Sequence, residues 1–300
     1  MSLKDFLIIF IGSIIFALLL IRIAPQQSSQ IIFPLAESFE KAKNVLLPQN
    51  SAQIKSIVEY ALADSTGTYA IVIKNLKTHE TFTQNGDRSF EPASLYKLWV
   101  MGATYKFILD GNILEDKTLS REVEELNNLF KISTDSAGLT EGTVTMKVGD
   151  AISQMITTSH NYAALLLVSE VRNSRVSSFM REQGFKNSSL GEPPKTTAED
   201  IALFFEKLYQ GTMIDSESSK KMLDLLARQK LNDRIPKYLP SNIEVAHKTG
   251  ELGNFKHDAG IIFGKDPILI VVLSESKSPQ TAAERIAQLS KNVYNYFENK

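Results

Sequence analysis

The stretch Phe90-Glu91-Pro92-Ala93-Ser94-Leu95-Tyr96-Lys97 is the part of this sequence from which fold and chemistry can be worked out. A serine and a lysine three positions apart lie on one face of a helix, one turn from each other. The lysine can then lower the cost of deprotonating the serine, which is the minimum for a nucleophilic serine that works without a histidine base. Ser94 and Lys97 are therefore the candidate nucleophile and proton acceptor.

The Ser-x-x-Lys spacing is a weak signal by itself. It occurs three more times in the chain, at Ser38, Ser218 and Ser274. The copy at Ser94 differs by its context: Ser159-His160-Asn161 follows 65 positions later, and Lys248-Thr249-Gly250, the single Lys-Thr-Gly of the chain, begins 89 positions after Ser159. Three short motifs in a fixed order are far more specific than any one of them.

The flanking sequence predicts secondary structure around these motifs. A helical period of apolar residues runs from Leu95 to Leu109 and ends at Asp110-Gly111-Asn112. Upstream, residues 68–73 read as a buried strand and residues 81–83 as a second one. A helix that begins the domain is expected from Ser51, which is a plausible N-cap.

Strands return only late in the sequence. Residues 112–230 have mainly helical patterns, whereas residues 244–247, 259–263 and 268–273 read as strands. A last helix comes after them, with Ser278 as N-cap and Pro279 at its first position. The predicted fold is α/β of the α+β type: one antiparallel sheet built from both ends of the domain, flanked by helices, with a helical subdomain inserted in the middle.

Composition excludes several classes of function. The 300 residues carry a net charge of −1, so nothing indicates nucleic acid as a partner. The chain has no cysteine and four histidines without ligand spacing, so we expect no metal site and no cofactor.

The N-terminus predicts a membrane anchor. Residues 6–21 form an uncharged apolar run between Lys4 and Arg22, and residues 6–24 approach the length that spans a bilayer. We therefore expect an anchor over residues 1–24, a tether over 25–50 and a folded domain over 51–300. A cleaved signal peptide is the alternative, although no small-x-small pair comes after the run.

From about Tyr60 to the C-terminus, the chain resembles the class A β-lactamase and penicillin-binding serine hydrolase superfamily. The resemblance rests on residues 90–97, on residues 155–164 around Ser159-His160-Asn161, and on Lys248-Thr249-Gly250, in the order typical of that superfamily. It implies that Ser94 attacks a lactam or peptide carbonyl and is acylated. Lys97 would take the serine proton, directly or through water, and Ser159 would relay a proton to the leaving nitrogen.

The resemblance also assigns the binding groups. Asn161 would hold the substrate amide, and Lys248 and Thr249 would bind the substrate carboxylate. Gly250 would let the ligand backbone approach closely. The backbone N–H groups of Ser94 and Glu251 would form the oxyanion hole.

Two positions depart from the family pattern. His160 replaces the usual aspartate of the second motif, and we interpret it as structural. The loop that carries the deacylating glutamate in class A β-lactamases is much shortened here, and Glu192-Pro193 is its only remnant. Glu192 is thus a candidate deacylation base or a solvent-exposed acid, and Glu199 reads as first-turn charge of the next helix.

The resemblance leaves three functions open. The first is a β-lactamase with weak deacylation, and the second is a D,D-carboxypeptidase that acts on peptidoglycan stem peptides. The third is a β-lactam sensor that is acylated without turnover. Each would work on the extracytoplasmic side of the cytoplasmic membrane, held there by a single membrane-spanning segment.

Overall fold

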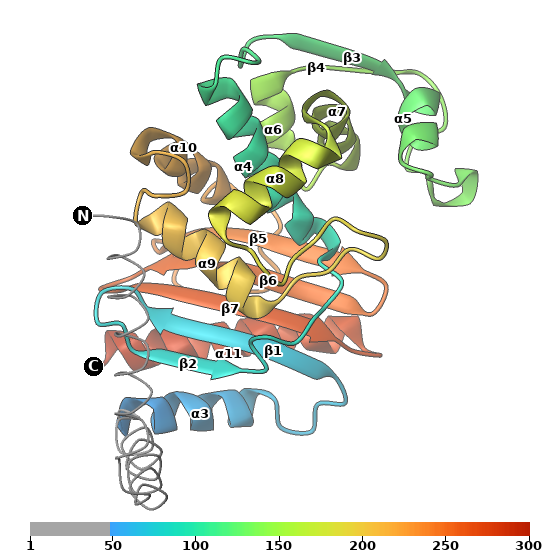
Figure 1. Cartoon of the computed structure of the whole chain (residues 1–300). Helices are drawn as coiled ribbons and strands as arrows, with labels where there is room; N and C mark the ends of the chain where they lie inside the picture. Colours follow the sequence, from blue (N-terminus) through green and yellow to red (C-terminus); the bar gives the residue numbers. More distant parts are fainter. Residues whose placement is uncertain (1–48) are drawn as a thin grey trace, which may run out of the picture. The chain divides into compact units, whose positions relative to one another are not determined.

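The computed structural model describes residues 49–300 (Figure 1). The anchor expected for residues 1–24 and most of the tether expected for residues 25–50 lie outside this range. Within residues 49–300, no helix is both long and apolar enough to cross a membrane. Helix α3 (Gln49–Ala61) begins two residues before Ser51, so the prediction that Ser51 is its N-cap was wrong.

The centre of the domain is an antiparallel sheet with the strand order β2-β1-β7-β6-β5. Its strands are β1 (Thr68–Asn75), β2 (Thr81–Gln84), β5 (Glu244–Leu252), β6 (Phe255–Phe263) and β7 (Pro267–Glu275). The pairing of β1 with β7, in which Val72 lies opposite Val271, joins the two ends of the domain. This confirms the predicted sheet and leaves β5 as an edge strand.

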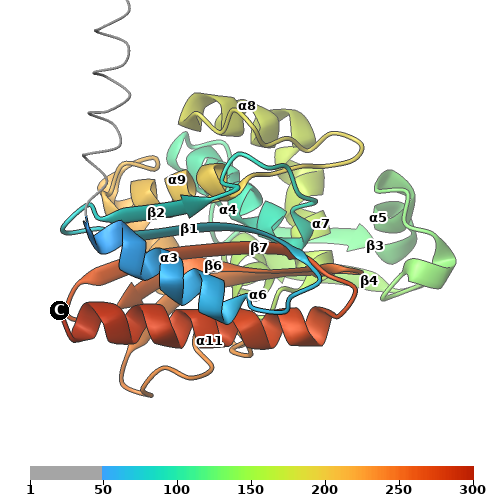
Figure 2. The same cartoon turned by 90° about the horizontal axis from the view of Figure 1, so that it is seen from below.

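Helices cover both faces of the sheet, and alternate residues of each strand enter different cores. Ile71 and Ile73 of β1 pack in the core formed with α3 and α11 (Pro279–Glu298), which lie side by side beneath the sheet (Figure 2). Ala70 and Val72 pack in the larger core on the opposite face. The near-continuous apolar run of β1 results from this double coverage.

Most of the remaining helices pack on that opposite face, and those within residues 112–230 form the predicted insertion. The helices on that face include α4 (Tyr96–Leu109), α6 (Val148–Thr157), α7 (Asn161–Val171), α8 (Asn173–Gln183), α9 (Ala198–Tyr209) and α10 (Ser216–Leu226). As predicted, Glu199 lies in the first turn of α9, whose N-cap Thr197 accepts a hydrogen bond from the Asp200 N–H at 3.2 Å. Ser278 does stand at the N-cap of α11, but its hydroxyl pairs with Thr281 instead of a helix N–H.

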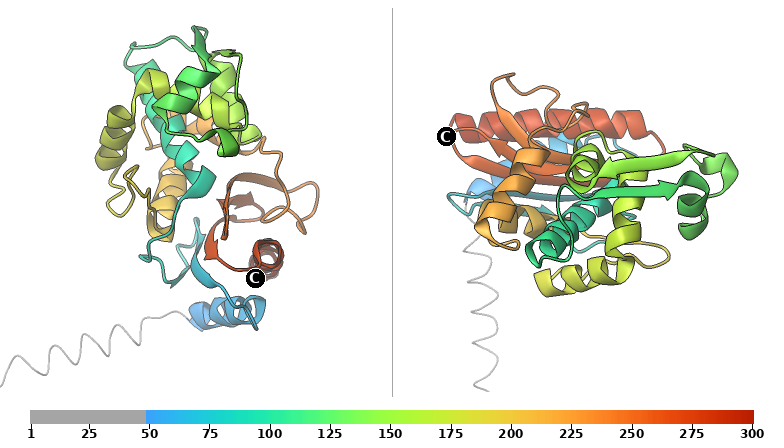
Figure 3. Two further views of the ribbon diagram at one scale, coloured as in Figure 1. Left: turned by 90° about the vertical axis from the view of Figure 1, so that its right-hand side faces the viewer. Right: turned by 90° about the horizontal axis from the view of Figure 1, so that it is seen from above.

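The sequence did not predict a two-stranded ribbon within the insertion. Strands β3 (Thr118–Glu122) and β4 (Thr143–Lys147) pair antiparallel, and α5 (Val123–Leu129) lies between them in sequence. Together they extend away from the main sheet (Figure 3). Strand β3 buries only Leu119 and strand β4 only Val144, so neither strand shows a clear alternation of apolar residues.

Candidate active site

Ser94 lies in a single 3₁₀ turn, η1 (Ala93–Leu95), that leads directly into α4. Ala93 has a φ of 45°, a left-handed conformation that is uncommon for a residue with a Cβ. The Leu95 N–H donates to the Pro92 carbonyl at 3.0 Å and closes the turn. Ser94 is partly exposed, so a substrate can reach its hydroxyl at the start of the helix.

The segment before Ser94 is fixed from two sides. Phe90 and Thr196 exchange two backbone hydrogen bonds of 2.8 Å. On the other side, His257 Nδ1 accepts from the Ser274 N–H at 3.0 Å, so its Nε2 carries the proton and donates to the Glu91 carbonyl at 2.8 Å. Burial lowers the pKa of His257 to about 4, which keeps the imidazole neutral in this role.

Lys97 is completely buried on the first turn of α4. In its protonated form, its Nζ donates to the Ser159 carbonyl at 2.5 Å, to Asn161 Oδ1 at 2.8 Å and to Ser159 Oγ at 3.2 Å. Burial lowers the pKa of Lys97 to about 7, so a large fraction of this amine is neutral near neutral pH. The structure thus brings together the first and second motifs through this lysine.

The second motif forms the connection between α6 and α7. Ser159 has a φ of 59°, which is again left-handed, and the next residue caps α7. His160 is the N-cap of that helix, because its Nδ1 accepts the Ala163 N–H at 3.1 Å. Burial, together with the charge of Lys97, lowers the pKa of His160, so a neutral ring caps the helix. The structural interpretation of His160 is confirmed.

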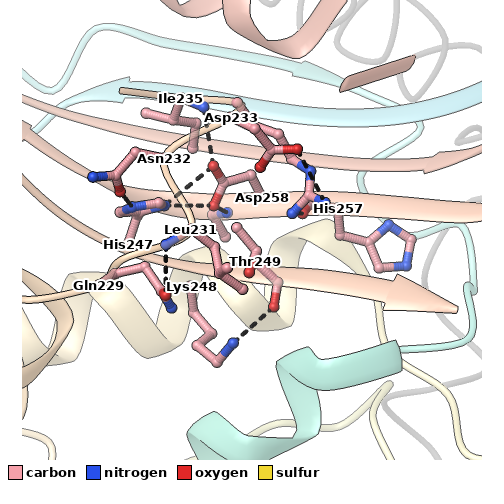
Figure 4. A network of polar contacts seen from close by, with 12 residues as sticks. Gln229, Leu231, Asn232, Asp233, Ile235, His247, Lys248, Thr249, His257 and Asp258 are labelled. Carbon is pink, nitrogen blue, oxygen red and sulfur yellow. Dashed lines mark hydrogen bonds and ion pairs between the residues drawn. The ribbon is translucent and has the colours of Figure 1, made fainter. Parts of the chain in front are cut away.

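Lys248 reaches the same serine from β5. Its Nζ donates to Ser159 Oγ at 3.0 Å and to the Thr249 carbonyl at 2.9 Å, the latter contact being drawn in Figure 4. Burial lowers the pKa of Lys248 to about 7, and the neighbouring charge of Lys97 contributes to this shift. Ser159 Oγ therefore lies between two buried amines. The binding of a substrate carboxylate by Lys248 stays a prediction.

Gly250 brings β5 against the nucleophile segment. A Cβ built on it would come within 3.1 Å of Pro92 O, Leu95 Cγ and His257 Cδ2, which is tighter than most real contacts. Glycine therefore serves the packing of η1 on the strand. Its role in the approach of a ligand stays a prediction. Ser94 and Glu251, the expected oxyanion donors, flank this contact.

A buried polar network supports the far side of the Lys-Thr-Gly strand (Figure 4). His247 Nδ1 lies 2.9 Å from a carboxylate oxygen of Asp258, and its Nε2 lies 3.0 Å from Asn232 Oδ1. The other Asp258 oxygen accepts the Ile235 N–H at 3.0 Å. We did not predict this network, although a carboxylate inside an apolar strand requires a buried partner and could have indicated it.

The Glu192 carboxylate makes its ion pair outside this group of residues. Its side chain is 85% exposed, and its carboxylate pairs with Lys131 at 3.2 Å. Among the contacts of residues 49–300, none joins it to Ser94 or Lys97. Within residues 49–300, there is also no hydrogen bond between Ser94 Oγ and Lys97. The two residues are neighbours because they are three positions apart, which is about one helical turn.

The arrangement has what acyl transfer to a serine requires. An accessible hydroxyl stands at a helix start, a partly neutral amine lies one turn away, and a second hydroxyl between two amines can pass a proton onward. These groups come from η1, α4, the α6–α7 connection and β5.

The comparisons with known proteins agree with this geometry. The model of the β-lactamase enzyme family matches residues 50–297, and the chain belongs to that family. It is an enzyme of the serine hydrolase type that acts on amide bonds. No curated protein matches the chain by sequence.

Solved structures share the fold at low sequence identity. A β-lactamase from Sphaerobacter thermophilus is 23% identical with a TM-score of 0.73, over 82% of this chain and 97% of that one. PBP-A is 22% identical with a TM-score of 0.74, over 84% and 97%. A mutant of PBP-A, described as an acyl-enzyme complex with penicillin G, is 22% identical with a TM-score of 0.73, over 82% and 96%.

Proposed function

We propose that this protein cleaves β-lactams or D-Ala-D-Ala-type amides through an acyl-enzyme on Ser94, and that it releases the acyl group slowly. The observation that carries the proposal is the position of Ser159 Oγ, within 3.2 Å of Lys97 Nζ and 3.0 Å of Lys248 Nζ. Two buried amines on one hydroxyl provide both a proton acceptor and a path for returning the proton.

Acylation is the step that these contacts support. Neutral Lys97 takes the proton of Ser94 as the hydroxyl attacks the carbonyl, and the amides of Ser94 and Glu251 stabilise the oxyanion. The proton then passes from Lys97 through the Ser159 hydroxyl to the leaving nitrogen. Protonated Lys248 keeps the Ser159 oxygen polarised during this transfer.

Slow deacylation is the part of the proposal that Glu192 supports. Water must attack the ester, and a base near the ester carbonyl accelerates that attack. An 85% exposed carboxylate paired with Lys131 is poorly placed for this work. We therefore expect Ser94 to remain acylated for long periods with β-lactams.

A D,D-carboxypeptidase is the second candidate function. Strand β5 is an edge strand, and an extended peptide can pair along such an edge. The mutant of PBP-A described with penicillin G supports acylation by a penicillin in a relative of the same fold. Slow release of a β-lactam is compatible with either activity.

The location of the enzyme is also a proposal. Residues 6–24 would hold it in the cytoplasmic membrane as a single-pass protein with the catalytic domain outside, where peptidoglycan peptides and β-lactams are found. Protease added to intact spheroplasts should degrade the domain. Its protection until the cells are lysed would contradict this location.

The test uses a chromogenic β-lactam and compares the full-length protein with Ser94→Ala. We expect a burst equal to the enzyme concentration, then little turnover, and no burst in Ser94→Ala. Sustained turnover that Glu192→Gln abolishes would show instead an efficient β-lactamase with Glu192 as its base. A signal from Ser94→Ala equal to that of the wild type would refute the proposal.

A further inference from the structure

Glu251 holds an unusual pair of cations beside the Lys-Thr-Gly motif. Its carboxylate accepts from Arg234 Nη2 at 2.7 Å and pairs with Lys256 Nζ at 2.5 Å. Both cations are buried, with the Arg234 side chain only 3% exposed, whereas the Glu251 side chain is 57% exposed. The Glu251 carboxylate therefore lies between two buried cations and the solvent.

This cluster stands at the place expected to receive a substrate carboxylate. Glu251 comes two residues after Thr249 on β5, so their side chains share a face of the strand. Lys256 lies directly opposite Glu251 on β6 and Asp258 opposite Thr249, which extends the same polar row. Arg234 comes from the segment before β5 and also faces the His257 carbonyl at 3.5 Å.

The charges of the cluster balance without a ligand. Arg234 and Lys256 contribute two positive charges, and Glu251 contributes one negative charge. Asp233 adds a second, weaker partner at 3.6 Å from Arg234. Burial raises the pKa of Glu251, but its contacts with Lys256 and Arg234 outweigh this and lower the pKa overall, so the carboxylate is ionised at neutral pH.

We propose that Glu251 determines specificity by occupying, with its own carboxylate, the cations that a substrate carboxylate would need. The site then favours an amide or lactam whose neighbouring group carries no negative charge, such as a carboxamide or an ester. This inference rests on the proposed acylation of Ser94 and narrows the substrate class of that same site. It weighs against the D,D-carboxypeptidase, whose substrate carries a free carboxylate next to the scissile amide.

The physical reason is the cost of a second carboxylate. A substrate carboxylate that enters beside Thr249 has two options. It displaces the Glu251 carboxylate from Arg234, or it lies next to that carboxylate and is repelled by its negative charge. An uncharged group meets neither cost. Specificity here comes from a repulsive element as well as from attractive contacts.

The experiment compares one penicillin in two forms, as the free C-3 carboxylate and as its carboxamide. The second-order rate constant for acylation of the full-length protein is measured for both, and the quantity of interest is their ratio. We expect the wild-type protein to react faster with the carboxamide than with the carboxylate, and Glu251→Gln to raise the carboxylate-to-carboxamide ratio by about tenfold or more. Glu251→Ala should shift the ratio in the same direction.

Glu244→Gln is the matched control, because Glu244 is the exposed first residue of the same strand. Its ratio should equal that of the wild type, and thermal melting of each variant verifies that it is folded. If acylation depends on Ser94 but neither Glu251 variant raises the ratio, this inference is overturned and the proposed function stays intact. Loss of Ser94-dependent acylation with both penicillin forms would instead overturn the proposed function, and the inference with it.

Discussion

The pKa of Lys97 predicts how the rate of acylation changes with pH. The amine is completely buried, and burial lowers its pKa from the ordinary lysine value of 10.5 to about 7. Only the neutral amine can accept the proton of Ser94. The rate should therefore rise with pH through the pKa of Lys97 and fall when this group is protonated.

The size of the effect depends on the neutral fraction. With a pKa of about 7, this lysine is half neutral at pH 7, whereas an exposed lysine would be neutral in about one molecule in 3,000. Between pH 8 and pH 5 the neutral fraction of Lys97 falls about 100-fold. The acylation rate constant should fall by about the same factor, with a midpoint near 7.

Stopped-flow fluorescence with a reporter penicillin gives the rate constant at each pH, under conditions where acylation limits the signal. Intrinsic fluorescence at pH 5 verifies that the protein remains folded, since Trp99 is fully buried in the core. Lys97→Arg keeps a charged donor that cannot become neutral, and it should lose acylation at every pH. A wild-type rate that stays constant down to pH 5, or a midpoint near 10, would refute the role of Lys97 as the base.

Two further predictions concern the residues around the nucleophile. The pKa of His257 is about 4 in the folded protein and near 6.5 in the unfolded chain, so the unfolded state binds the proton first as pH falls. The free energy of unfolding in urea of the wild type, minus that of His257→Gln, should therefore fall by about 2 to 3 kcal/mol between pH 7.5 and pH 4.5. If this difference is the same at both pH values, His257 is not held neutral in the folded protein. In Gly250→Ala the new Cβ would press on Pro92 and Leu95, which should cost about 1 to 3 kcal/mol and slow acylation. Gly138→Ala is the control, because its Cβ meets only Tyr162 at an ordinary 3.6 Å, and equal effects of the two variants would contradict the close packing of β5 on η1.

Much of the fold could be predicted from local patterns. The strands at both ends of the domain have long apolar runs, because both faces of the sheet are covered. Helix α4 was found at the predicted place, although all residues from 97 to 105 are buried and it has no exposed polar face there. The ribbon of β3 and β4 could not be predicted, because only Leu119 and Val144 are buried in it. Ser51 was misassigned because a good N-cap residue also occurs inside helices.

The candidate site was predicted as a set of residues but without its geometry. Motif order brought Ser94, Ser159 and Lys248 together, and the structure places Ser159 and Lys248 within hydrogen-bonding distance of each other. The left-handed backbone at Ala93 and Ser159 has no sequence signal, since glycine or asparagine would be expected there. Such conformations persist when the surrounding packing determines them, and that packing depends on long-range contacts such as the one at Gly250.

The two lysines form one titrating unit, and this limits how their roles can be separated. Lys97 and Lys248 both donate to Ser159 Oγ, and the charge of Lys97 lowers the pKa of Lys248. The first proton lost near pH 7 therefore belongs to the pair, and its loss makes the remaining amine hold its own proton more tightly. A substitution at one lysine changes the charge state of the other, so its kinetic effect is not the contribution of a single residue. Because the loss of one proton makes the remaining amine hold its own more tightly, one amine can act as the base while the other stays protonated beside the shared Ser159 hydroxyl.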